Sequence, residues 1–423
     1  MESNKLFTFC NVYIFLWLIY NLQSLILGGK GGAFSTLIII FLLGISAYHF
    51  AYALFHYKMP DYMKGLVVLV FMFTLYGIIL IMSGKTIMFM RTRAVVKNYN
   101  YIKSIYISLL PIFSFYVFTR KGKLTKDVIQ KWTLLFFITA ILQFFQNQRE
   151  FLMMAGEDTE EFTNNFGYIF LSIIPLFAFW EHKRIVQYIG LGLSMAFIIL
   201  GMKRGAIVIG ALSIMWFMFQ SMKNASRKQK IWVFILSVVL IVVGFYLVSD
   251  MLQNSEYFNQ RLEDTIEGNS SGRDRLYGVF WRHFTQESNP LLFLFGNGAN
   301  ATLTISSNYA HNDWLEIAIN QGLLGLVIYV VYWIKFYKTW KKSKFDSQIY
   351  LALGLILFIY FMRTIFSMSY TAMPIYATLC LGYCMGMISE NENMVDTESE
   401  DENMVDTEYP LSTEESMDFN ETT

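Results

Sequence analysis

Hydrophobic runs of membrane-spanning length recur along the chain and are separated by short polar segments. A helix needs about 20 apolar residues to cross the roughly 30 Å hydrocarbon core of a bilayer. The pattern predicts about twelve such helices, near 7–27, 34–55, 65–83, 101–118, 132–146, 164–180, 185–202, 205–220, 231–249, 312–334, 348–366 and 370–388. The sequence therefore predicts an all-α membrane protein, with both termini on the same side because the number of crossings is even.

One long polar interval, 250–310, separates the ninth predicted span from the tenth. Within it, apolar residues in 251–266 recur at helical spacing and predict an amphipathic helix over the bundle. Residues 273–284 predict a second helix, and a glycine turn follows at 296–298. We therefore expect a polytopic domain over 1–388 with one large helical loop.

Positive charge predicts the orientation of the chain. Short cytoplasmic loops are enriched in Lys and Arg, and four basic clusters fall on one side of the twelve-span arrangement, at 120–126, 181–184, 223–230 and 335–344. This side is predicted to be the cytoplasm, so both termini are cytoplasmic and 250–310 is extracytoplasmic. The segment 85–97 disobeys the rule, because Lys85, Arg91, Arg93 and Lys97 would lie outside. Either a span is miscounted or re-entrant there, or the outward charge binds an anionic ligand.

Charge is distributed unevenly between the bundle and the C-terminal tail. Only 15% of the residues are charged, far below the roughly 25% of soluble domains. Residues 389–423 contain thirteen Asp or Glu and no Lys or Arg, so the net charge of +1 leaves +14 on the rest. We expect 389–423 to be a disordered cytoplasmic tail, either simply solvated or used for docking or regulation. No nucleic-acid partner is expected.

All four basic residues of 250–310 are arginines, namely Arg261, Arg273, Arg275 and Arg282. Guanidinium groups bind phosphate oxygens in a bidentate fork that lysine lacks, which indicates an anionic ligand on this side. Arg204 stands at a predicted helix junction on the same side, where it either contributes to function or snorkels to the interface.

His311 directly precedes the tenth predicted span, where free backbone amides attract anions. Its near-neutral pKa suits proton transfer, although a single histidine is also a common interface residue. The sequence contains no HExxH, Walker, GxSxG or DxD motif, so zinc, NTP and serine hydrolysis lack support. No metal or cofactor is predicted.

Several motifs in order resemble the O-antigen ligase and O-antigen polymerase superfamily. They are FTNNFG (162–167), MKRGA (202–206), SGRDRLY (271–277), FGNGAN (295–300) and AHNDWLEIAINQGLLG (310–325). The resemblance covers about 145–340. Two positions depart from the family pattern, because Lys203 replaces a small polar residue and Tyr277 stands where an aromatic residue, often tryptophan, is usual.

The resemblance implies a GT-C-like bundle and a metal-independent, inverting glycosyltransferase. Such an enzyme takes a glycan from a polyprenyl (undecaprenyl) pyrophosphate on the outer membrane face. Arg204 and Arg273 would then bind the pyrophosphate and His311 would orient or deprotonate the acceptor hydroxyl. Further substrate-binding candidates are Arg275, Arg282, Asn165, Asn312, Tyr277, Arg91 and Arg93, although helix capping or hydrogen bonding between helices also explains Asn165, Asn312 and Glu316.

The resemblance leaves the acceptor open. A polymerase for a surface polysaccharide such as capsule or O-antigen would extend another lipid-linked glycan, and this is the function we favour. A ligase would transfer the glycan to lipid A core or another acceptor. A flippase or transporter for the lipid-linked glycan and a membrane scaffold are the remaining alternatives. The implied location is the cell (inner or plasma) membrane, and the implied partners are membrane lipids, a chain-length regulator and a flippase.

Overall fold

The computed structural model describes residues 8–27, 32–88, 95–154, 166–201, 203–223, 273–306 and 308–405, together with scattered positions from 226 to 253. Within these ranges nearly all regular structure is helical. The exception is a short antiparallel hairpin of β1 (Ile87–Met88) and β2 (Val95–Val96). The predicted all-α fold is confirmed.

The helices of the first half follow the predicted spans closely. They are α1 (Phe9–Leu27), α2 (Ala33–His56), α3 (Asp61–Met82), α4 (Tyr99–Leu109), α5 (Pro111–Arg120) and α6 (Lys126–Met154). The predicted fourth span is divided into α4 and α5, with Pro111 as the first residue of α5. Proline has no backbone N–H and favours the first turn of a helix, which explains the new start.

The second half continues with α7 (Phe166–Ile173), the 3₁₀ helix η2 (Ile174–Lys183), α8 (Arg184–Leu200) and α9 (Arg204–Lys223). After the polar interval come α12 (Arg273–Thr285), α13 (Pro290–Phe295), α14 (Ala301–Ser306), α15 (Asp313–Lys342), η3 (Ser343–Phe345), α16 (Ser347–Phe366) and α17 (Ile375–Val405). The predicted ninth span, 231–249, is described only at scattered positions. The predicted amphipathic helix at 251–266 lies outside the described residues except at position 253.

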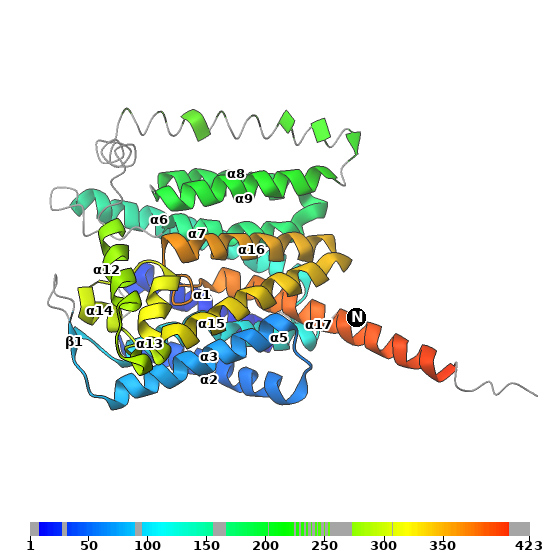
Figure 1. Ribbon diagram of the computed structural model, residues 1–423. Coiled ribbons are helices and arrows are strands. Elements are labelled where there is room, and N and C mark those ends of the chain that lie inside the picture. Colours follow the sequence, from blue (N-terminus) through cyan, green and yellow to red (C-terminus); the bar gives the residue numbers. More distant parts are fainter. Residues whose placement is uncertain are drawn as a thin grey trace, which may run out of the picture.

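Eight of the described helical segments are long and apolar enough to cross a membrane. This number is smaller than twelve partly because 166–200 counts as one segment, although α7 and α8 pack against each other. Among described elements, α17 packs along α5, α15 along α3 and α16 along η2. The chain is therefore a polytopic helical bundle whose neighbours are distant in sequence (Figure 1).

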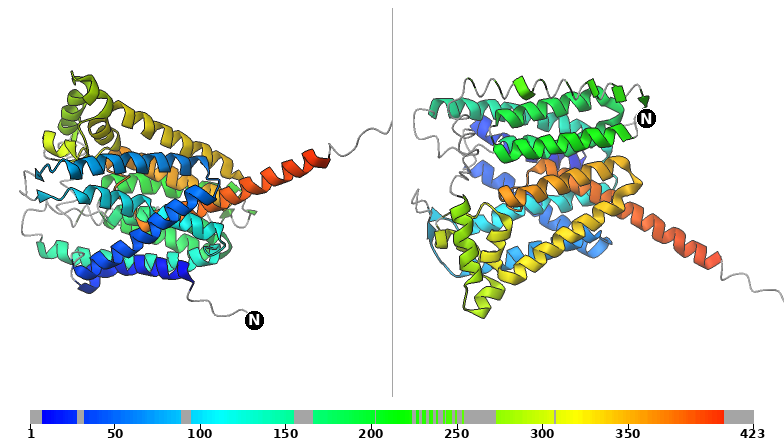
Figure 2. Two further views of the ribbon diagram at one scale, coloured as in Figure 1. Left: turned by 90° about the horizontal axis from the view of Figure 1, so that it is seen from below. Right: turned by 45° about the horizontal axis from the view of Figure 1, so that its top comes forward.

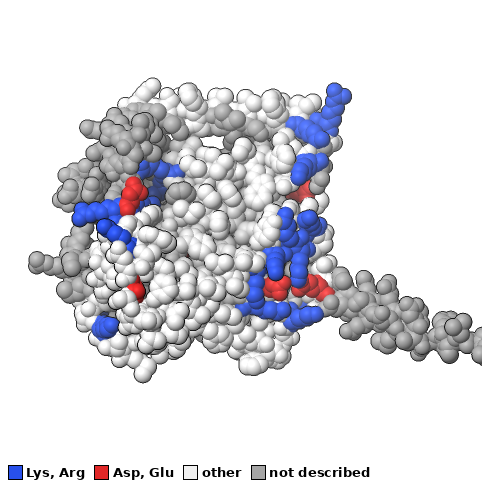
Figure 3. Space-filling view, in the orientation of Figure 1, with Lys and Arg blue, Asp and Glu red and all other residues white. Residues whose placement is uncertain are grey.

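The two ends of the bundle differ. The elements α12, α13, α14 and β1 lie at one end, whereas the start of α1 lies at the other, as does the projecting end of α17 (Figures 1 and 2). On the face drawn in Figure 3, charged residues gather at both ends and leave an uncharged band between them. Such a band suits the hydrocarbon layer of a membrane, where charge is costly. We call the end that carries α12–α14 the loop end.

The position of the β1–β2 hairpin helps to distinguish a miscounted or re-entrant span at 85–97 from outward charge that binds an anionic ligand. Residues 99–120 form a complete apolar crossing, and β1 contacts α14. The hairpin therefore lies at the loop end, as expected if no span is miscounted. Arg91 and Arg93 lie outside the described residues.

The start of the tail differs from expectation. Disorder was expected from residue 389, but α17 continues to Val405. Near its midpoint, Glu392 Oε1 lies 3.1 Å from Lys342 Nζ, which also lies 3.3 Å from Asp61 Oδ2. These contacts join the start of the tail to the bundle at Glu392, and the expected disorder of the rest of the tail stays a prediction. Residues 406–423 lie outside the described residues.

Candidate functional site at the loop end

His311 occupies the short connection between α14 and α15. Its backbone φ is 52°, in the left-handed region that residues other than glycine adopt infrequently. The next residue, Asn312, caps α15, because its Oδ1 accepts a hydrogen bond from Leu315 N at 3.1 Å. Its Nδ2 donates to Ile365 O of α16 at 3.4 Å. The helix cap expected for Asn312 is confirmed, and it holds His311 beside the end of α16.

The arginine helix α12 packs against the same connection. Tyr277 Oη shares its one hydroxyl hydrogen between His311 O at 3.3 Å and Ile365 O at 3.2 Å. Arg273, the first residue of α12, lies one helical turn before Tyr277 and is half-buried. Tyr277 thus positions α12, and with it Arg273, against the His311 backbone.

A third segment, the residues just before α9, lies near both the His311 connection and α12. Burial lowers the pKa of the His311 imidazole below its ordinary 6.5, and the positive charges of Arg273 and Lys203 lower the pKa further. Lys203 immediately precedes α9, of which Arg204 is the first residue. Lys203 and Arg273 therefore both lie close enough to His311 to act on it, while the roles of Arg204, Arg273 and His311 in a common site stay predictions.

Close packing of small residues fixes the 203–204 turn. A Cβ atom on Gly201 would lie 2.9 Å from Gly167 N, and one on Gly167 would lie 3.1 Å from Ala206 Cβ. The start of α7 therefore touches the turn directly. Asn165, one residue before α7, lies outside the described residues.

The remaining predicted arginines of α12 are more exposed. Arg275 and Arg282 both face solvent, and Arg282 Nε donates to Gly278 O of its own helix at 3.1 Å. Neither is among the charges that act on His311. Their substrate-binding roles remain predictions.

The glycine turn of FGNGAN crosses α15 at a kink. Gly322 has φ 69° inside α15, and a Cβ atom on Gly296 would lie 2.5 Å from Gly322 N. Asn297 N donates to Ile319 O at 2.8 Å and Gly298 N donates to Asn320 O at 3.0 Å. These backbone contacts join the loop to the start of the membrane-spanning part of α15.

Glu316 of α15 joins α14 and the connection before α15 to its own helix. Its side chain is 1% exposed and accepts hydrogen bonds from Thr302 Oγ1 at 2.7 Å, Ala310 N at 2.9 Å and Asn320 Nδ2 at 2.9 Å. A buried carboxylate is tolerated when such donors surround it. The hydrogen-bonding explanation considered for Glu316 fits these contacts.

The sequence prediction missed three charged residues near this site. Lys203 was noted only as a departure from a motif. Asp313 is fully buried and accepts hydrogen bonds from Tyr329 Oη at 2.8 Å and Ser369 N at 2.9 Å. Arg363 is 3% exposed near the end of α16. Charges inside apolar spans are a recognised signal of function that could have identified Asp313 and Arg363.

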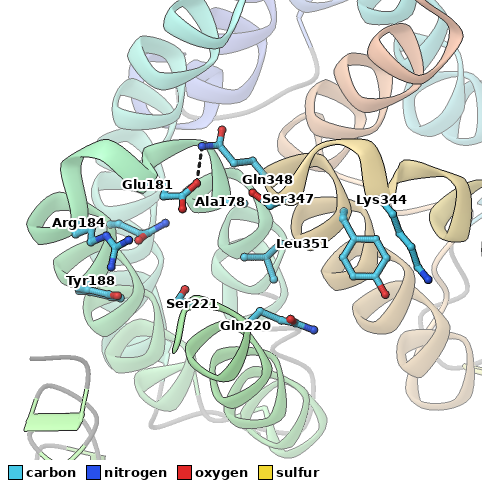
Figure 4. Close-up of a pocket in the computed structure, with 12 residues that line it drawn as sticks. Ala178, Glu181, Arg184, Tyr188, Gln220, Ser221, Lys344, Ser347, Gln348 and Leu351 are labelled. Atoms are coloured by element: carbon cyan, nitrogen blue, oxygen red, sulfur yellow. Dashed lines mark hydrogen bonds between the residues drawn. The ribbon is translucent and has the colours of Figure 1, made fainter. Parts of the chain in front are cut away.

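A polar cavity of about 190 Å³ lies away from this site. Its lining includes Glu181, Arg184 and Tyr188, and Gln348 Nε2 donates to Glu181 Oε2 at 2.9 Å (Figure 4). These residues belong to the starts of α8 and α16 and the end of η2, at the end of the bundle opposite to His311. Within the described ranges, no group of three or more His, Cys, Asp or Glu residues is arranged to hold a metal ion.

The fold and these contacts define a polytopic membrane protein with a cationic, histidine-containing site at one end of its bundle. Residues 189–330 match the family model described as O-antigen ligase. This match supports the O-antigen ligase and polymerase superfamily, as the motifs predicted, and indicates an O-antigen ligase-type function. It includes Lys203, Arg204, Arg273 and His311. No match was found among curated proteins.

Proposed function

We propose that the chain is a surface polysaccharide polymerase. It transfers a glycan from a polyprenyl pyrophosphate carrier to a sugar hydroxyl of another lipid-linked glycan, on the outer face of the cell membrane. The observation that carries this proposal is the packing of α12, which begins at Arg273, against His311 through Tyr277, with Lys203 and Arg273 close enough to act on the imidazole. Both termini are cytoplasmic in this proposal, which agrees with the basic clusters at the end opposite to the loop end.

The proposed reaction is one direct displacement. The acceptor oxygen forms a bond to the anomeric carbon while the bond from that carbon to the pyrophosphate oxygen breaks, with inversion. Negative charge develops on the departing polyprenyl pyrophosphate, where the fixed charges of Arg204 and Arg273 stabilise it. The proton of the acceptor hydroxyl passes to His311.

The environment of His311 supports its role as the base. A base must be unprotonated to accept a proton, and the lowered pKa of His311 favours the neutral imidazole. General base help of this kind is typically worth about 10²- to 10⁴-fold in rate.

An apolar groove beside the site supports a lipid-linked donor. It has a volume of about 510 Å³ and contains Trp314, three residues after His311, and Trp340 near the far end of α15. Its other aromatic lining residues are Trp216, Trp333, Tyr337, Phe358 and Phe361. A polyprenyl chain is apolar and would remove this surface from lipid contact while its pyrophosphate lies near His311.

The test is to replace Arg273 and His311 singly with alanine in the native cell and to separate the surface glycan on a gel. We expect long chains to be lost and single-repeat lipid-linked units to accumulate outside the membrane. Gln286→Ala is the matched control, because Gln286 is exposed just beyond α12.

Other outcomes identify the alternatives. Single-repeat units that accumulate inside indicate a flippase, and full-length polymer that stays on the carrier indicates a ligase. Chains of normal length at normal protein abundance in both variants overturn the catalytic assignment.

A further inference from the structure

Arg363 carries a permanent positive charge into an apolar helix. It lies three residues before the end of α16, within a segment that is apolar enough to cross a membrane. Its side chain is 3% exposed. Burying a guanidinium without enough hydrogen bonds or opposite charge around it is costly. The groups that surround Arg363 therefore indicate its role.

The hydrogen bonds of the Arg363 guanidinium are incomplete. Nη2 donates to Ala372 O over a long 3.4 Å, while Nε and Nη1 are buried and have no hydrogen-bond partner among the described residues. Asp313 interacts with Arg363 electrostatically, but the hydrogen bonds described for its carboxylate come from Ser369 and Tyr329. Nε and Nη1 of Arg363 therefore lack a well-aligned hydrogen bond within the described residues, although the Tyr360 hydroxyl interacts with the guanidinium.

Aromatic rings hold the guanidinium in place. Its Cζ lies 4.9 Å from the ring centroid of Tyr168 and 5.0 Å from that of Tyr360. Such cation–π contacts favour a fixed orientation and leave N–H groups at the edge of the guanidinium plane free to donate.

The part of α16 that contains Arg363 forms one wall of the candidate site. Ile365 O accepts hydrogen bonds from both Tyr277 and Asn312, the two residues that position His311. Tyr168 interacts electrostatically with Arg363 and also with Arg273. Arg363 and Arg273 thus both lie near one tyrosine, although 90 residues separate them in sequence.

We propose that Arg363 is a further binding residue for the diphosphate group of the donor, contributed by α16 from outside the region that matches the family. This inference rests on the proposed function. Phosphoryl oxygens accept strong, charge-assisted hydrogen bonds from guanidinium groups. On binding, these oxygens replace the long contact to the carbonyl of Ala372, an exposed residue between α16 and α17, and engage Nε and Nη1.

Inorganic pyrophosphate is the probe for this proposal, titrated against the purified full-length chain in detergent. We expect Arg363→Gln to weaken pyrophosphate binding about 10- to 100-fold, the loss typical of hydrogen bonds to a charged group. Arg363→Lys keeps the charge and the ring contacts but lacks the planar donor array, so we expect weakened binding in a variant that still folds.

Arg120→Gln is the matched control. Arg120 also has a buried Nε without a partner among the described residues and lies over a tyrosine ring, that of Tyr57 at 5.3 Å. It ends α5 at the opposite end of the bundle, so its replacement should leave pyrophosphate binding unchanged.

The outcomes separate this proposal from the proposed function. Wild-type pyrophosphate affinity in both folded Arg363 variants, with weakened binding in Arg273→Gln, overturns the role of Arg363 alone. Pyrophosphate that fails to bind the wild-type chain also overturns it. Failure of the proposed function is read separately, from normal glycan chains in cells that carry Arg273→Ala or His311→Ala.

Discussion

At the residue scale, the neutral state of His311 depends on neighbours that are far away in sequence. Burial disfavours the charged imidazolium, and Arg273 and Lys203 repel it. The same positive charges that suit an anionic leaving group therefore also keep the proposed base free of its proton. Lys203, which departs from the family motif, has a physical role in this arrangement.

We predict that the acid limb of the activity profile lies below pH 6.5, because the pKa of His311 is lowered from that value. Protonation below the lowered pKa removes the base. Lys203→Gln removes one repelling charge, so it should raise the pKa of His311 and move the acid limb to higher pH. Initial rates measured against pH with lipid-linked donor extracted from the native membrane test this.

Lys203→Arg serves as the control for charge and should leave the acid limb in place. If Lys203→Gln leaves the limb unmoved while it retains activity, Lys203 does not tune His311.

At the element scale, the loop is joined to the bundle by a backbone crossing. Gly296 and Gly322 approach so closely that neither position has room for a side chain, and both have positive φ. The motif residues FGNGAN and NQG therefore have a structural reason to be glycine at these two positions. The crossing places α13 and α14 on α15 and so positions the connection that carries His311.

We predict that Gly296→Ala destabilises the protein more than Gly298→Ala. Both positions have positive φ, which costs an alanine roughly 1–2 kcal/mol. At Gly296 the new Cβ would also lie 2.5 Å from backbone atoms of Asn320 and Gly322, whereas nothing lies within 4 Å of a Cβ at Gly298. Thermal unfolding in detergent measures the difference, and equal melting temperatures would show that the crossing is not tight.

At the scale of the whole molecule, charged residues gather at the two ends of the bundle, with an uncharged band between them (Figure 3). The loop end carries Arg273, Lys203 and the β1–β2 hairpin, while the opposite end carries the lysines at the end of α15. In the orientation we propose, basic residues at the loop end face outward, although Lys and Arg are usually enriched in cytoplasmic loops. This exception is expected if these residues bind an anionic substrate.

Single cysteines test this orientation. The native Cys10, Cys380 and Cys384 are buried and should stay unlabelled by a membrane-impermeant maleimide. We predict that Lys97→Cys and Gln286→Cys are labelled in intact cells and that Lys123→Cys is labelled only after lysis, because all three positions are exposed but Lys123 lies at the opposite end. Labelling of Lys97→Cys only after lysis would contradict the proposed path of the hairpin.

The sequence by itself determined the helical bundle, its charged ends and the motif residues of the site. Hydrophobic length and charge bias act locally along a chain in a membrane, so they can be read without knowing which helices touch.

Only the tertiary structure decided which distant groups meet. Two glycines pack the turn that carries Lys203 against α7. Tyr277 and Asn312 bond to Ile365 at the end of α16, two residues beyond Arg363. The last helix continues beyond residue 388, where Glu392 meets Lys342. These contacts depend on how helices pack, and helix packing leaves no periodic signal in the sequence. The same limit applies to His311, which the motif identified but whose lowered pKa comes from charges that tertiary contacts bring beside it.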